Sequence, residues 1–119
     1  MYEIKLYRTS GGKSPVEEYL KELKRDAKIK ELAQIKTYEE RLAEHGMAVN
    51  NVFPHTIRKL NDDVYELRPG SNRIFFFYYT GNEFVLLHAY RKHGQKAPPS
   101  EIKKAENERK DYIRRNQNG

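Results

Sequence analysis

Residues 64–92 read VYELRPGSNRIFFFYYTGNEFVLLHAYRK, and this stretch decides the fold. Three runs of apolar and aromatic residues are separated by two turns, Pro69-Gly70-Ser71-Asn72 and Gly81-Asn82. Glycine and asparagine tolerate a positive φ, so the Gly81-Asn82 pair is a good signal for a two-residue hairpin turn. The stretch therefore predicts three consecutive antiparallel strands, over residues 64–68, 73–79 and 84–92.

Counting across the two turns brings basic side chains together at one end of the sheet. If both hairpins are regular, Arg68 lies opposite Arg73, and Arg73 lies opposite Tyr90. Like charges directly opposite one another destabilise a sheet, so a bound anion is the simplest reason to keep two arginines there. Further polar side chains are predicted on the same face: Glu66 and His88 one row further in, and Lys92 at the rim.

Strand alternation divides the remaining side chains between two faces. The core face is predicted to carry Tyr65, Leu67, Ile74, Phe76, Tyr78, Val85, Leu87, Ala89 and Arg91. The face with the arginines is predicted to carry Val64, Phe75, Phe77, Tyr79, Phe84 and Leu86 in its apolar part. We expect helices to cover the first face and the second to stay partly open.

The N-terminal half predicts a strand followed by two helices. Residues 2–8 alternate, and Ser14-Pro15 is a good N-cap and first-turn pair for a helix with an apolar stripe of Val16, Tyr19, Leu20 and Leu23. A second helix over about 26–44 carries Ile29, Leu32, Ile35, Tyr38 and Leu42, and Gly46 ends it. Residues 47–56 are predicted to be a linker, 57–60 a short strand, and a last helix to begin at Ser100 or at the prolines before it.

The element order β-α-α-β-β-β-β-α, without a repeat or a long linker, predicts one α+β domain over residues 1–119. We expect the N-terminal strand and two helices to pack on one face of a mostly antiparallel, twisted sheet, with a C-terminal helix added.

Composition narrows the possible functions. The chain has no cysteine and no apolar run long enough for a membrane span or a signal peptide, which favours a reducing cytoplasm and no membrane partner. A net charge of +6 favours a polyanionic partner such as nucleic acid. The four histidines lack the spacing of a metal site, and no glycine-rich phosphate loop or serine nucleophile elbow is present. We expect no metal and no cofactor.

Ribonuclease chemistry suits the side chains that remain. The RNA 2′-hydroxyl is itself the nucleophile, so a protein need only move protons and stabilise negative charge at phosphorus, which arginines can do without a metal. Each side chain also has a purely structural interpretation. Arg68 and Arg73 can pair with Asp62, Asp63 or Glu66, His88 can be a half-buried strand residue, and Tyr90 can be ordinary packing.

Three segments, taken together, resemble one family. KLNDDVYELRPG at 59–70, NRIFFFYY at 72–79 and VLLHAYRKHGQKAP at 85–98, followed by a charged C-terminal helix, resemble the HigB type of the RelE-superfamily toxins, including phage-derived members. The resemblance implies a RelE-like fold and a toxin that cleaves mRNA, usually on the ribosome, without a metal. It also implies a cognate HigA-like antitoxin with a helix-turn-helix domain, and products with a 2′,3′-cyclic phosphate and a 5′-hydroxyl.

Carried over by position, the resemblance makes Arg73 the best candidate for phosphate stabilisation. Arg68 matches a basic position before the turn, and Lys96 matches the lysine of the loop after the last strand. Arg91 and Lys92 both cover the basic site at that strand's end, and the face count favours Lys92. The catalytic candidates are Arg73, Arg68, Lys92, Lys96, His88 and Tyr90, and the RNA-binding candidates are Glu66, Arg91, His93, Lys59 and Arg58.

Two departures from the family pattern leave the acid and the base open. Glu66 stands where founding RelE members have lysine, and Tyr112 lies too far into the last helix to match their C-terminal tyrosine. Lys96, His93, His88 and Tyr90 remain candidates. A non-catalytic nucleic-acid-binding regulator or a structural phage protein are the competing classes.

Overall fold

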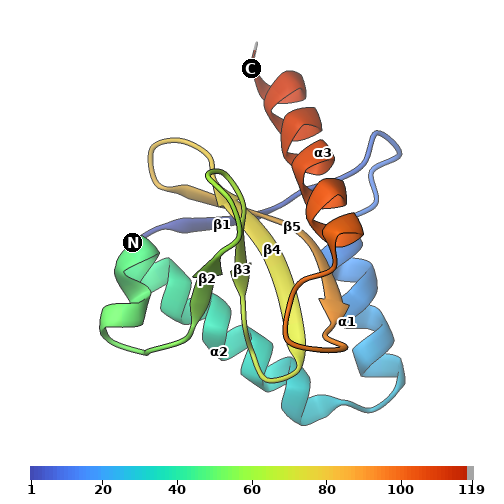
Figure 1. Cartoon of the computed structure of the whole chain (residues 1–119). Helices are drawn as coiled ribbons and strands as arrows, with labels where there is room; N and C mark the ends of the chain where they lie inside the picture. Colours follow the sequence, from blue (N-terminus) through green and yellow to red (C-terminus); the bar gives the residue numbers. More distant parts are fainter. Residues whose placement is uncertain (118–119) are drawn as a thin grey trace.

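The computed structural model describes residues 1–117, and it has the predicted element order (Figure 1). The last two residues of the predicted domain, 118–119, lie outside the described residues. The elements are β1 (Glu3–Leu6), α1 (Pro15–Arg25), α2 (Ile29–His45), the 3-10 helix η1 (Gly46–Asn51), β2 (Ile57–Lys59), β3 (Tyr65–Leu67), β4 (Asn72–Tyr78), β5 (Glu83–Arg91) and α3 (Pro99–Asn116). The α+β class is confirmed.

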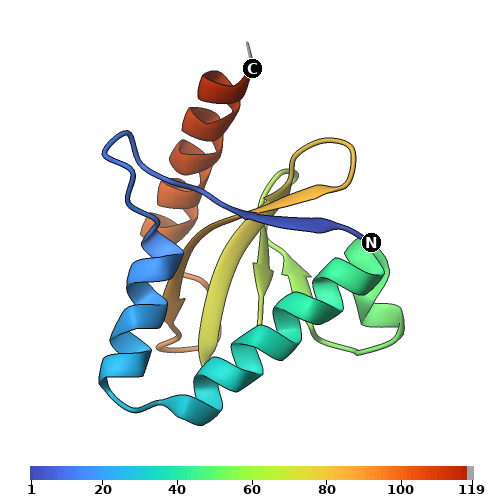
Figure 2. The same ribbon diagram turned by 180° about the vertical axis from the view of Figure 1, so that it is seen from behind.

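The five strands form one sheet in the order β1-β5-β4-β3-β2. β1 runs parallel to β5, and every other neighbouring pair is antiparallel, so the sheet is mostly antiparallel as predicted. The predicted register is confirmed at the arginine end, where Arg73 pairs with Tyr90 and Leu67 pairs with Ile74. Figures 1 and 2, which view the molecule from opposite sides, show α1 and α2 on one face of the sheet and α3 on the other.

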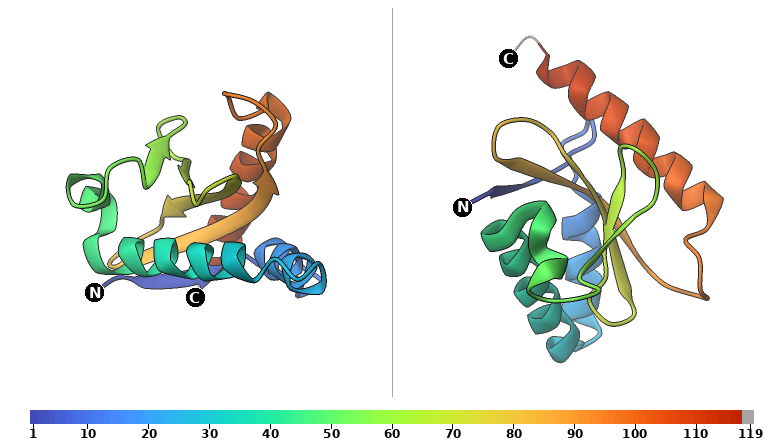
Figure 3. Two further views of the ribbon diagram at one scale, coloured as in Figure 1. Left: turned by 90° about the horizontal axis from the view of Figure 1, so that it is seen from below. Right: turned by 60° about the vertical axis from the view of Figure 1, so that its left-hand side comes forward.

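Local signals explain where the first two helices begin and end. The side chain of Ser14 accepts a hydrogen bond from the backbone N–H of Glu17 at 3.2 Å, and Pro15 occupies the first turn of α1. Gly46 ends α2 with φ +63°, in the left-handed region that favours glycine. Figure 3, seen from below, shows α2 running across the underside of the sheet.

The structure corrects three predictions in this half. α2 begins at residue 29 rather than 26, because Asp26 serves as the C-cap of α1. Ile29 therefore lies in the first turn, away from the sheet, and is 62% exposed instead of joining the core. Residues 46–51 form the 3-10 helix η1, where a linker over 47–56 was predicted.

A β-bulge corrects the predicted faces of β5. The pairing with β4 shifts by one residue between Phe75 and Phe76, so that Phe75 pairs with His88 but Phe76 pairs with Leu86. A one-residue slip moves the side chains of β5 on the Gly81-Asn82 side of the bulge, residues 84–87, to the opposite face from the one counted. Phe84 and Leu86 therefore pack with α1 and α2, whereas Val85 and Leu87 pack with α3, the reverse of the alternation-based assignment.

The face predicted to stay partly open is covered over its middle by α3. A second apolar cluster forms between α3 and the sheet, with Phe75, Phe77, Val85, Leu87 and Ala105 fully or almost fully buried. Polar contacts anchor both halves of the helix. At its N-terminal half, the Nδ1 atom of His88 lies 2.6 Å from Glu108 and its Nε2 atom lies 3.1 Å from Glu101.

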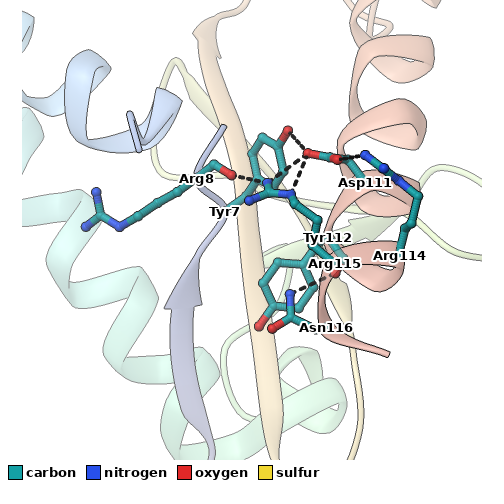
Figure 4. A network of polar contacts seen from close by, with 7 residues as sticks. All are labelled: Tyr7, Arg8, Asp111, Tyr112, Arg114, Arg115 and Asn116. Atoms are coloured by element: carbon teal, nitrogen blue, oxygen red, sulfur yellow. Dashed lines mark hydrogen bonds and ion pairs between the residues drawn. The ribbon is translucent and has the colours of Figure 1, made fainter. Parts of the chain in front are cut away.

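A second polar network anchors the C-terminal half of α3 beside β1 (Figure 4). The Tyr7 hydroxyl donates to Asp111 Oδ2 at 2.6 Å, and Arg115 Nη2 donates to the same oxygen at 2.8 Å. Arg115 also donates to the backbone carbonyl of Arg8, and Arg114 Nη2 donates to the other Asp111 oxygen at 2.5 Å. Asp111 therefore links α3 to the segment that follows β1.

This network predicts an acid-dependent loss of stability. Hydrogen bonds from Arg115, Tyr7 and Arg114 lower the pKa of Asp111 below its ordinary value. A lowered folded-state pKa gives stability that is present above the unfolded-state pKa of about 3.9 and is lost as pH falls through the folded-state value. Because Asp111 is partly exposed, we expect Asp111→Asn to cost about 1 kcal/mol at pH 7. Urea unfolding of both proteins should show this difference shrinking below about pH 4; a difference independent of pH would contradict the assignment.

Candidate functional site

The sheet register gathers four cations around one carboxylate at the end of the sheet next to the β3–β4 turn. Arg58 on β2 pairs with Glu66 on β3, and Arg68 follows one row further along. The positive charges of Arg73, Arg68, Arg58 and Lys92 all favour the ionised form of Glu66. Four cations against one carboxylate leave this end of the sheet with a net positive charge, which suits an anionic ligand.

Arg73 is held rigidly at the start of β4. Its side chain is buried, and its Nη1 atom donates to the carbonyls of Gly70 at 2.8 Å and Asn72 at 2.9 Å. Its Nε atom lies 3.8 Å from Glu66 Oε1. Burial lowers the pKa of Arg73, while Glu66 opposes that shift. The turn therefore fixes the orientation of the guanidinium, which is the preorganisation that stabilisation of a developing charge requires.

Glu66 is a buried carboxylate whose position orients both arginines. It is 3% exposed, and its Oε1 atom lies 3.6 Å from Arg68 Nε and 3.8 Å from Arg73 Nε. Burial raises the pKa of Glu66, and the arginines oppose that rise. The structural interpretation of the arginine pairing is thus correct for Glu66, whereas Asp62 and Asp63 pair instead with Lys59 and Arg109.

Arg68 retains unused hydrogen-bonding capacity. Its Nε atom is the one buried side-chain nitrogen or oxygen within residues 1–117 that lacks a hydrogen-bond partner. Buried polar atoms are almost always paired in folded proteins, so an unpaired one calls for an explanation. The same side chain lines a pocket of about 390 Å³ together with Arg73, Gly70, Gln34, Tyr38, Pro54 and His55. The Nε atom faces Glu66 Oε1 at 3.6 Å, and the positive charge of this guanidinium at the pocket wall suits an anion.

His55 is, with Gln34, one of the pocket residues that sequence reasoning missed. Its backbone has φ +66°, a left-handed conformation that non-glycine residues rarely adopt. Asn50 holds the following segment: its Oδ1 atom accepts hydrogen bonds from the backbone N–H groups of Thr56 and Ile57, at 2.9 and 3.0 Å. Strain maintained in this way by surrounding contacts is typical of functional sites. The sequence pattern here, Asn50 followed by Pro54-His55, predicted only a linker.

Tyr90, near the end of β5, and Lys92, just after that strand, lie beside the arginines. Tyr90 pairs with Arg73 and packs against Phe75, with ring centroids 5.4 Å apart. Burial, followed by the charge of Glu66, raises the pKa of Tyr90 to about 12. Its phenol is therefore protonated at neutral pH and can donate a proton or a hydrogen bond. Lys92 is exposed, and its backbone N–H donates to Ser71 O in the β3–β4 turn at 2.9 Å.

Two candidate residues lie away from this cluster. Arg91 points to the α2 side of the sheet, where its Nη2 atom lies 2.6 Å from Glu31 Oε1. Asn72 donates to the same Glu31 oxygen at 2.9 Å, so this group fastens the sheet to the helix. His88 is 2% exposed and is held between Glu101 and Glu108 under α3. The geometry favours structural roles for Arg91 and His88, and it supports the face count that preferred Lys92.

The remaining candidates are exposed. Arg58 lies on β2 next to Glu66, and Lys59 lies 3.7 Å from Asp62. His93 and Lys96 lie in the loop between β5 and α3. Within residues 1–117 no group of three or more histidines, cysteines and carboxylates is arranged to hold a metal ion, and no helix is both long and apolar enough to cross a membrane.

Comparison with protein families shows which family the chain belongs to. The family model described as phage-derived protein Gp49-like (DUF891) matches residues 18–110, which is well over half of the 119 residues. The chain belongs to the Gp49-like family. The matched range runs from α1 into α3 and includes every candidate residue of the arginine pocket. A comparison of this Gp49-like chain with curated proteins finds no match.

Proposed function

We propose that the chain is a HigB-type toxin of the RelE superfamily, acting as one domain in the cytoplasm. In this proposal it cleaves mRNA on the ribosome without a metal, and a cognate helix-turn-helix antitoxin neutralises it. The observation that carries the proposal is the pocket that combines Arg68, Arg73 and a strained His55. Membership of a phage-derived family and the three sequence segments that resemble HigB-type toxins support it further.

The chemistry assigned to the pocket is transfer within the RNA backbone. The 2′-oxygen attacks the adjacent phosphorus and forms a new P–O bond, while the P–O5′ bond breaks. His55 accepts the 2′-hydroxyl proton, because imidazole is the side chain suited to proton exchange near neutral pH. Arg68 and Arg73 stabilise the negative charge on the phosphorus oxygens. Tyr90, protonated at neutral pH, donates the proton that the leaving 5′-oxygen takes up.

A cleavage assay with purified protein tests the proposal. We expect mRNA bound to programmed ribosomes to be cut, with 5′-hydroxyl and 2′,3′-cyclic phosphate ends at the cut. A non-catalytic regulator would instead bind RNA through the same cations, with affinity that falls steeply with salt, and leave it intact. Intact mRNA both on and off the ribosome would overturn the proposal.

A further inference from the structure

The arginine pocket is larger than a phosphate group requires. It is an open groove of about 390 Å³, wider than one phosphate group fills. Arg68, Arg73 and Gly70 form the wall next to the β3–β4 turn. The remaining walls come from α2 and from the segment before β2, and no step of the cleavage chemistry uses the two α2 side chains.

These α2 side chains, Gln34 and Tyr38, face the pocket together. They are four residues apart, so they lie on the same side of the helix. Tyr38 is half-buried, and the guanidinium of Arg41 lies 4.8 Å from the centre of its ring. Gln34 is exposed and carries one amide donor group and one carbonyl acceptor.

Gly70 sets the distance between Gln34 and the arginine wall. Its φ is +63°, and a Cβ atom at this position would lie 2.6 Å from Gln34 Oε1. Real Cβ atoms do not approach an oxygen so closely, so the glycine allows the amide to lie against the β3–β4 turn. The Gly70 carbonyl accepts one of the hydrogen bonds of Arg73. The amide and the phosphate-binding guanidinium are therefore positioned by the same residue.

The pocket thus combines the three kinds of group that a nucleotide needs. Two guanidinium groups suit the phosphate, the ring of Tyr38 suits a base plane, and the Gln34 amide suits the hydrogen-bonding edge of a base. Single-stranded RNA leaves those base edges free, so side chains can read them directly. A site for inorganic phosphate alone has no use for the Tyr38 ring or the amide.

We propose that Gln34 is a specificity-determining residue, which hydrogen-bonds the nucleobase adjoining the phosphate held by Arg68 and Arg73. This inference rests on the proposed function for its substrate, RNA. It assigns base preference to α2, an element that contributes nothing to the chemistry of cleavage.

Binding of the four ribonucleoside 3′-monophosphates and of inorganic phosphate tests the inference without any cleavage step. We expect each nucleotide to bind the wild-type protein more tightly than inorganic phosphate does, and the four bases to differ by about tenfold between the best and the worst. Gln34→Ala should bring the four affinities together and leave the affinity for inorganic phosphate unchanged. The carboxylate of Gln34→Glu only accepts hydrogen bonds, and guanine offers two adjacent N–H donors. This variant should therefore raise the affinity for the guanine nucleotide relative to that for the uracil nucleotide. Thr37→Ala, on an exposed part of the same helix, should change none of these values.

The two proposals fail in different ways in this experiment. If all four nucleotides bind no more tightly than inorganic phosphate, or if Gln34→Ala keeps the wild-type ranking, the role of Gln34 is wrong even where the protein cleaves mRNA. If the ranking depends on Gln34 but the wild-type protein leaves mRNA intact, the role of Gln34 stands and the proposed ribonuclease activity is wrong.

Discussion

Arg73→Ala is expected to reduce mRNA cleavage by at least about a hundredfold, because the pocket then loses its rigidly held guanidinium. The side chain is buried, and its bonds to the Gly70 and Asn72 carbonyls are lost with it. We therefore also expect the free energy of unfolding to fall by about 1–3 kcal/mol. Rates should be measured on ribosome-bound mRNA at a temperature where urea unfolding shows the variant to be folded.

Two further variants separate catalysis from folding at this position. Arg68→Ala removes a half-buried guanidinium that makes an ion pair with Glu66 but no hydrogen bond through Nε, so we expect a large loss of cleavage with a smaller loss of stability than in Arg73→Ala. Arg25→Ala, at an exposed position in the last turn of α1, removes the same charge far along the chain from the pocket and should change neither property. Full cleavage by folded Arg68→Ala and Arg73→Ala proteins would show that the arginine pocket is not the site of cleavage.

His55→Gly is expected to abolish most cleavage and to stabilise the fold. The imidazole assigned as the base is lost, which we expect to lower the rate by about a hundredfold or more. The left-handed backbone at φ +66° is relieved, because glycine adopts it without a steric cost. Allowing for the greater entropy of an unfolded glycine, we expect the free energy of unfolding to rise by about 0.5–1 kcal/mol.

Ala27→Gly is the matched control for this prediction. Ala27 is the other non-glycine residue with a positive φ within residues 1–117, at 57°, and it is exposed in the link between α1 and α2. It should gain similar stability and keep full activity. An active His55→Gly protein would show that another group accepts the proton. A destabilised one would show that the His55 side chain supports the loop.

Much of the fold could be predicted from local signals in the sequence. Ser14-Pro15 and Gly46 mark helix ends through the cap and the left-handed backbone that they allow. The turn at residues 69–72 sets the register of β3 against β4 as counted. Next to the Gly81-Asn82 turn Tyr78 pairs with Phe84, one residue away from the predicted two-residue hairpin, and the bulge restores the predicted pairing of Arg73 with Tyr90. The bulge between Phe75 and Phe76 could not be predicted, because an extra residue in β5 leaves no trace in an almost continuous apolar run.

The candidate site was only partly predictable for a similar physical reason. Strand counting brings Arg68, Arg73 and Glu66 together because neighbouring strands have a fixed register. Gln34 and His55 reach the same pocket from a helix and from an irregular segment, and no local rule relates either of them to the sheet. The role of His88 was open in the sequence because its partners, Glu101 and Glu108, lie on α3.

Selective sequencing of new 5′-hydroxyl ends in cellular mRNA tests the central claim most directly. The wild-type protein and Arg73→Ala would each be induced in growing cells without antitoxin, with protein levels matched. We predict abundant new 5′-hydroxyl ends within coding sequences and arrested growth for the wild-type protein, and neither for the variant. New ends that carry a 5′-phosphate, or arrested growth with intact mRNA, would contradict cleavage by 2′-hydroxyl attack in the arginine pocket.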